Sequence, residues 1–175
     1  ITVFGPPPTS GTRDAFVELV MAAGCKKFDA IQALEGDRKS EVCHRMRTDG
    51  PFIEAGENDN LIVQRLQADS SALGIFGYSF LFENQDTLKA VAVNGVEPSA
   101  STIADGSYTV ARPLFFYVKK DHIGVIPGLK EYAEFFVSDA IAGPGGPLAT
   151  YGLVPDPKLA DVQKTVADGT TVTMP

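Results

Sequence analysis

The chain has 175 residues, of which 44% are hydrophobic and 21% are charged, and its formal net charge is −7. This composition is typical of a globular protein with its own core, and the length fits one or two domains. The acidic balance argues against nucleic acid as a partner, because nucleic-acid surfaces are usually basic, and no apolar run in the sequence is long enough to span a membrane.

The first predicted element is a buried strand over residues 1–5, which three consecutive prolines bring to an end. A helix is predicted after them, because apolar residues recur there with helical spacing. Those residues are Phe16, Leu19, Val20 and Ala23. Gly24 stands where a C′ glycine would end this helix.

Ser10, Gly11, Thr12 and Arg13 therefore lie at the start of a helix that follows a strand. Free backbone N–H groups, the positive end of the helix dipole, two hydroxyls and a guanidinium suit a small anion. The segment is not a nucleotide P-loop, which needs Lys before Ser/Thr, and it lacks the G-x-S-x-G pattern of a nucleophile elbow. Two interpretations stay open: an anion site, or a plain helix cap with Arg13 paired to Asp14 or Glu18.

The middle of the chain alternates between short helices and short strands. A second cap-like loop, residues 56–60, precedes a helix, and its Asn58 and Asn60 suit either a ligand or the cap. Gly74 and Gly77 are expected to permit close backbone approach in a buried strand. Helices are predicted over 28–34, 39–47 and 83–88, strands over 52–55, 73–80 and 91–93, and a tight turn at Asn94-Gly95.

The chain changes character at Tyr108. Residues 108–120 are rich in Phe, Tyr and Val, and they predict a long extended crossing segment. Helices are predicted over 129–137, 148–151 and 159–166, after one helical turn at 101–104. The alternation of strands and helices predicts an α/β fold with a mixed, largely parallel sheet flanked by helices.

Cys25 and Cys43 are the only cysteines. Two thiols this close in the chain suggest a disulfide, although two reduced and unrelated thiols are the alternative. His44 follows Cys43, but no C-x-x-C or H-x-x-x-H spacing is present, so no metal site is expected. No catalytic residues are expected either, because no general base accompanies a nucleophile.

Three segments, residues 73–80, 108–120 and 125–132, occur in an order that resembles one known family. The chain is similar to the phosphate-binding proteins of bacterial ABC-type phosphate importers, and the resemblance covers nearly all of it. It covers only the C-terminal part of that family's usual chain. The resemblance implies a lobe of the periplasmic-binding-protein type II kind. Residues 1–107 would be the second lobe, and 108–175 a hinge crossing with returning helices of the first lobe, whose N-terminal part is absent.

The resemblance also implies a ligand set. Ser10, Gly11 and Thr12 match the family's phosphate loop position by position, and Asn58 and Asn60 resemble a loop that lines its cleft. Many relatives carry an Arg four residues before the Ser, where this chain has Pro6, and Arg13 is expected to take over that charge.

The implied function is binding of inorganic phosphate, without catalysis or a cofactor, as part of the solute-binding component that serves a membrane permease. Export to the periplasm is implied, with the signal peptide outside this chain, and an oxidising compartment favours the Cys25–Cys43 disulfide. The exposed lobe-facing surface is expected to allow self-association. Sulfate or molybdate is an alternative ligand, and a Ser-dependent phosphatase or esterase with Ser10 or Thr12 as nucleophile is an alternative function.

Overall fold

Three parallel strands form the sheet of this protein, seen in a computed structural model that describes residues 1–171. The chain divides into two compact units. Unit 1 comprises Ile1–Pro98 and Tyr108–Arg112, and unit 2 comprises Ser99–Ser107 and the described residues from Pro113 onward. The sheet belongs to unit 1.

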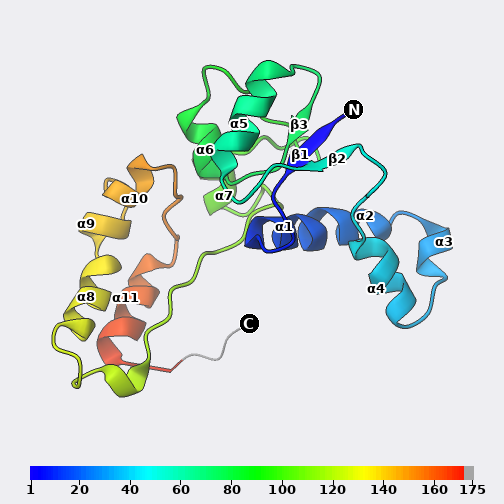
Figure 1. The fold of residues 1–175 in the computed structure, drawn as a ribbon. Helices are drawn as coiled ribbons and strands as arrows, with labels where there is room; N and C mark the ends of the chain where they lie inside the picture. The colour runs from blue at the N-terminus through cyan, green and yellow to red at the C-terminus, as the bar shows by residue number, and fades with distance from the viewer. Residues whose placement is uncertain (172–175) are drawn as a thin grey trace. The chain divides into compact units, whose positions relative to one another are not determined.

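The sheet has the order β2-β1-β3, with β1 (Val3–Gly5) between β2 (Phe52–Glu54) and β3 (Leu73–Gly74) (Figure 1). Both neighbours run parallel to β1, and Gly5 is aligned with Glu54. The predicted α/β class is confirmed, and the strands that the structure describes are all parallel. Phe4 on β1 is 6% exposed and belongs to the core of unit 1.

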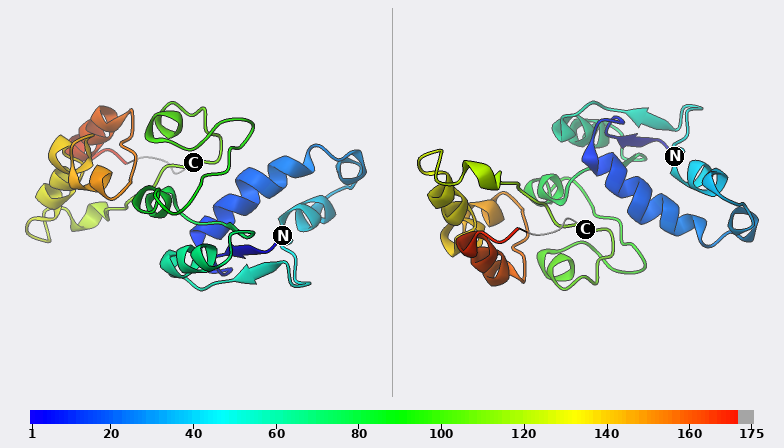
Figure 2. Two further views of the ribbon diagram at one scale, coloured as in Figure 1. Left: turned by 90° about the horizontal axis from the view of Figure 1, so that it is seen from above. Right: turned by 90° about the horizontal axis from the view of Figure 1, so that it is seen from below.

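A long helical rod follows β1 and the proline turn (Figure 2). It consists of α1 (Gly11–Phe16), a π-helical segment η1 (Val17–Ala22) and α2 (Ala23–Cys25), with helical backbone angles across both junctions. The predicted helix end at Gly24 is wrong, because the helix continues to Cys25 with Gly24 inside it. Packing of η1 against α4 and the Cys25 disulfide hold this last turn, so tertiary contacts override the helix-ending preference of glycine.

A disulfide joins the end of this rod to α4 (Asp37–His44), and the short helix α3 (Asp29–Gln32) lies between them. The bond links Cys25 to Cys43, whose Cα atoms are 5.9 Å apart, and Cys43 is buried. The predicted disulfide is confirmed, as are two short helices in this region, although both end earlier than predicted.

Helix α5 (Asp59–Ala68) packs on the sheet with Ile62 and Val63 buried. A Cβ atom at Gly74 would lie 2.6 Å from Leu66 Cδ1 and 3.0 Å from Ile62 Cγ2, so the absence of a side chain lets α5 approach β3. Gly74 therefore has the expected role. Gly77 does not, because its nearest neighbours would lie 3.8 Å from an added Cβ.

The predicted strand over residues 73–80 is wrong beyond Gly74. Strand β3 ends there, and residues from Tyr78 form helix α6 (Tyr78–Glu83) with Gly77 as its N-cap. An apolar run of this length does not distinguish a strand from a packed helix. The helix predicted over 83–88 is wrong, because α6 ends at Glu83, where that helix was expected to begin. The strand predicted over 91–93 is a single bridge from Val93 to Val96 around the expected Asn94-Gly95 turn.

Unit 2 is helical in its described part. Ala133 and Val137 are buried where α8 and α11 pack together, and Gln163 on α11 donates to the Val137 carbonyl at 3.0 Å. Its helices are α7 (Ala100–Ala104), the 3₁₀ turn η2 (Lys120–His122), α8 (Leu129–Phe136), α9 (Asp139–Ala142), α10 (Pro147–Thr150) and α11 (Leu159–Asp168). Helix α9 was not predicted.

None of the helices in residues 1–171 has the length and apolarity needed to cross a membrane.

The crossing segment of residues 108–119 has no helix or paired strand, as predicted. The Phe116 ring packs edge-on against Phe136, with 5.1 Å between ring centroids. Other apolar side chains of unit 2 remain exposed: Leu114 by 71%, Tyr117 by 71% and Tyr132 by 66%. We call Leu114, Tyr117, Tyr132 and Phe135 the apolar face of unit 2.

We predict that reduction of the disulfide destabilises unit 1. The bond closes a loop with a sequence separation of 18 residues. Chain-entropy arguments give about 3 kcal/mol for a loop of this size. Thermal unfolding with and without dithiothreitol should show a lower melting temperature for the reduced protein. The double variant Cys25→Ser/Cys43→Ser should already melt lower and should not respond to the reductant; an unchanged melting temperature would contradict the prediction.

Candidate anion-binding site

The carboxyl ends of β1 and β2 bring two loops to the same edge of the sheet. Residues 6–10 follow β1 and lead into α1, and residues 55–58 follow β2 and lead into α5. Because the strands are parallel, both loops start at the same edge, where α/β proteins usually bind ligands. Ser10–Arg13 and Asn58–Asn60, which the sequence singles out separately, are therefore brought to one edge.

Ser10 caps α1. Its Oγ accepts from the Thr12 backbone N–H at 3.3 Å, and its backbone is extended as an N-cap requires. Gly11 and Thr12 form the first turn, and within residues 1–171 the Thr12 hydroxyl has no hydrogen-bond partner. Since the Arg13 and Asp14 N–H groups donate to the Ser10 carbonyl, the N-terminus of the helical rod in the described chain offers the Gly11 N–H and the unused Thr12 hydroxyl.

Arg13 turns toward β2. Its guanidinium lies over the Phe52 ring, 5.4 Å from the centroid, and Nη1 donates to Glu54 Oε1 at 2.6 Å. Phe52 in turn packs on β1, since a Cβ atom at Gly5 would lie 2.7 Å from its ring. The Arg13 side chain is 17% exposed and that of Glu54 is 50% exposed. Its partner is Glu54, and neither Asp14 nor Glu18 of the capping interpretation pairs with it.

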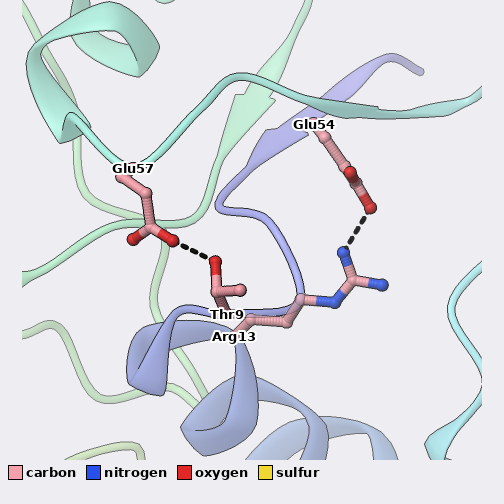
Figure 3. A network of polar contacts seen from close by, with 4 residues as sticks. All are labelled: Thr9, Arg13, Glu54 and Glu57. Atoms are coloured by element: carbon pink, nitrogen blue, oxygen red, sulfur yellow. Dashed lines mark hydrogen bonds and ion pairs between the residues drawn. The ribbon is translucent and has the colours of Figure 1, made fainter.

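A second carboxylate meets the loop after β1. The Thr9 hydroxyl donates to Glu57 Oε1, as Figure 3 shows together with the pair of Arg13 and Glu54. Two donors of this loop are therefore held by two acidic side chains from the β2 side. Both carboxylates are exposed to solvent.

Asn58 and Asn60 lie at the N-terminus of α5. Asn58 is its N-cap, and Asn58 Oδ1 accepts from the Asn60 backbone N–H at 3.0 Å. Both asparagines are exposed. The half-buried Asp59 lies between them and accepts from the Gly77 backbone N–H at 3.4 Å. Burial raises the pKa of the Asp59 carboxyl above its ordinary value and the charge of Glu57 adds to this, while the Gly77 hydrogen bond opposes it.

Sequence reasoning missed four charged residues at this edge: Glu54, Glu57, Asp59 and Arg112. Arg112, from the crossing segment, donates through Nη2 to the Gly11 carbonyl at 2.8 Å. The sequence could have predicted the three acids at this site. They lie at or after the end of the predicted second strand, and if that strand runs parallel to the first, its carboxyl end lies at the same edge as the Ser-Gly-Thr loop. No pattern in the sequence predicts the position of Arg112, since it lies 101 residues after Gly11.

The arrangement suits an anion better than a metal. Within the described residues, no group of three His, Cys, Asp or Glu side chains could hold a metal ion. The loop after β1 combines hydroxyls, helix N–H groups and guanidinium groups, which are directed donors for an oxyanion.

Comparisons with known proteins agree with this architecture. The model of the PBP superfamily domain matches residues 1–140. The phosphate-binding protein PstS of Staphylococcus saprophyticus is 31% identical over 144 residues, which are 79% of this chain and 37% of the relative. The protein of the same name from Staphylococcus haemolyticus is 32% identical, with 79% and 38% covered. Protein SphX of Synechococcus elongatus is 30% identical over 146 residues, with 80% and 36% covered.

No solved structure gives a significant match. The chain spans little more than a third of the length of these curated relatives. The names of the two PstS relatives describe binding proteins, and none of the three names describes an enzyme.

We predict that the Asp59 carboxyl titrates above the ordinary range of aspartate and that Glu57→Gln lowers its pKa by removing a like charge. Carbon-detected NMR titration of the Asp59 side chain measures both values. Glu83→Gln, which removes a charge at the end of α6, is the control and should leave the pKa unchanged. Equal pKa values in the wild type and in Glu57→Gln would refute the coupling.

The same shift has a consequence for stability. Because folding raises this pKa, the folded protein binds the Asp59 proton more tightly than the unfolded chain does. The contribution of Asp59 to the free energy of unfolding is therefore largest below the unfolded-state pKa and falls as the pH rises through the folded-state pKa.

Proposed function

Because this chain belongs to the PBP superfamily, we propose that it is part of a solute-binding protein for inorganic phosphate. One observation carries the proposal: the Ser10-Gly11-Thr12-Arg13 loop starts a helix at the carboxyl edge of a parallel sheet. This is the place where directed N–H and hydroxyl donors suit a small oxyanion. The names of the PstS relatives support phosphate as that oxyanion.

The proposal gives each predicted residue a role. Ser10 and Thr12 donate their hydroxyls, and Gly11 and Thr12 donate backbone N–H groups to phosphate oxygens. The Thr12 N–H then has to exchange its bond to Ser10 Oγ for one to the ligand. Arg13 adds a charge-assisted hydrogen bond. Asn58 and Asn60 contribute amide donors from the second loop. The Asn58 side chain then has to exchange its capping bond to Asn60 for one to the ligand.

The rest of the phosphate site is proposed to lie outside these residues. The relatives are much longer than the match, and a site between two lobes needs donors from both. In this proposal residues 1–107 form the second lobe, and residues 108–175 form a hinge crossing and returning helices of the first lobe. The complete protein would be exported and would deliver phosphate to the membrane permease of an ABC importer, without catalysing a reaction.

Self-association through the apolar face of unit 2 is the second part of the proposal. Leu114, Tyr117, Tyr132 and Phe135 are each more than half exposed. Exposed apolar side chains in this number often contact another protein surface. In the complete protein the first lobe would cover these residues, and in the 175-residue chain a second copy would cover them.

Isothermal titration and NMR titration of the chain with phosphate, with sulfate as the control, test the proposed ligand. We expect phosphate-selective binding that is weaker than micromolar, because part of the site is absent, with shifts at the Gly11 and Thr12 amides. Arg13→Ala and Thr12→Val should weaken it. Submicromolar affinity would contradict an incomplete site. Equal binding of sulfate would favour a less selective oxyanion-binding protein, and no binding of either anion would refute the proposed role of this loop.

Sedimentation velocity tests the proposed self-association. We expect the wild-type chain to form dimers as its concentration rises and Leu114→Lys/Tyr117→Lys to remain monomeric, because two charges on the contact oppose burial. Tyr151→Lys changes an exposed aromatic residue outside the apolar face, so this variant should still dimerise. A monomeric wild-type chain at all concentrations would exclude this surface as a dimer contact.

A further inference from the structure

We propose that Arg112, more than Arg13, supplies the positive charge that attracts the anion to the Ser10-Gly11-Thr12 loop. The inference rests on the proposed function and adds a binding residue from a distant segment. Arg112 lies in the crossing segment, 101 residues after Gly11, yet its Nη2 donates to the Gly11 carbonyl at 2.8 Å. A Cβ atom at Gly11 would lie 2.9 Å from the same nitrogen, so the guanidinium lies directly against the loop.

The two arginines differ in their partners. Arg13 is neutralised by Glu54, whose Oε1 accepts from its Nη1 at 2.6 Å. Arg112 is bonded to an uncharged carbonyl, and no acidic side chain in the part of the chain described by the structure forms an ion pair with it. An anion that approaches Arg13 must share or displace Glu54, whereas Arg112 retains four further N–H donors and its full charge.

Within residues 1–171, neither Glu57 nor Asp14 forms an ion pair with Arg112. Glu57 is engaged by the Thr9 hydroxyl. Asp14 lies in the first turn of α1, where its charge already interacts favourably with the helix N-terminus. The positive charge of Arg112 is unfavourable at that position, because a cation beside a helix N-terminus faces the positive end of the dipole.

This unfavourable placement is the main argument for a ligand. Without an anion, a guanidinium and a helix N-terminus repel each other, and the bond to the Gly11 carbonyl only partly offsets this. An oxyanion between them would interact favourably with both.

Matched arginine-to-glutamine variants of the full 175-residue chain test the inference, with inorganic phosphate as the probe and the Gly11 and Thr12 amides as NMR reporters. Arg112→Gln should raise the dissociation constant about tenfold or more, as expected for a lost charge-assisted hydrogen bond. Arg13→Gln should raise it by only about threefold, because the Arg13 guanidinium is already engaged by Glu54. Arg38→Gln, on α4, removes the same charge elsewhere in unit 1 and should leave binding unchanged.

Two further measurements separate binding from a structural role. Arg112→Gln should unfold at the same or a higher temperature than the wild type in phosphate-free buffer, and it should lose the phosphate-induced rise. Glu54→Gln should tighten phosphate binding, because it frees Arg13. A lower melting temperature of Arg112→Gln with unchanged phosphate affinity would mean that the residue only supports the fold, and would overturn the inference.

The outcomes also separate this inference from the proposed function. Phosphate-induced shifts in the wild type that persist with equal affinity in Arg112→Gln overturn the inference alone. A larger loss in Arg13→Gln than in Arg112→Gln overturns it as well. Absence of any shift in the wild-type chain refutes the proposed function, and the inference with it.

Discussion

The parallel pairing of β1 with β2 and β3 is the constraint on which the described site depends. Strand β1 is central, so the chain that leaves its carboxyl end meets the chain that leaves β2 at one edge. Gly5 permits this meeting, because only a residue without a side chain lets the Phe52 ring lie against β1. Arg13 then lies over that ring and reaches Glu54. The ion pair is thus a consequence of strand order and register.

The charge pattern at this edge restricts how the proposed anion could be attracted. The chain has a net charge of −7, so its overall field opposes an anionic ligand. Carboxylates of Glu54 and Glu57 hold two of the donors, Arg13 and Thr9. The proposed binding would therefore depend on short-range, directed groups: helix N–H groups, hydroxyls and guanidinium groups.

Unit 2 poses a different physical problem. Its helices bury few side chains, and Leu114, Tyr117, Tyr132 and Phe135 remain in contact with solvent. Apolar residues on both faces of an extended segment are typical of a strand that is covered on both sides. The contact proposed for these side chains would remove them from solvent.

The sequence alone determined the α/β class, the helix start at Ser10 and the extended nature of residues 108–119, because these depend on local periodicity, capping chemistry and composition. It did not determine where the apolar run after Leu73 changes from strand to helix, since both conformations bury the same side chains. Nor did it place Arg112 beside Gly11 or pair Arg13 with Glu54. Those contacts join residues 101 and 41 positions apart, and only the tertiary fold brings such distant side chains together.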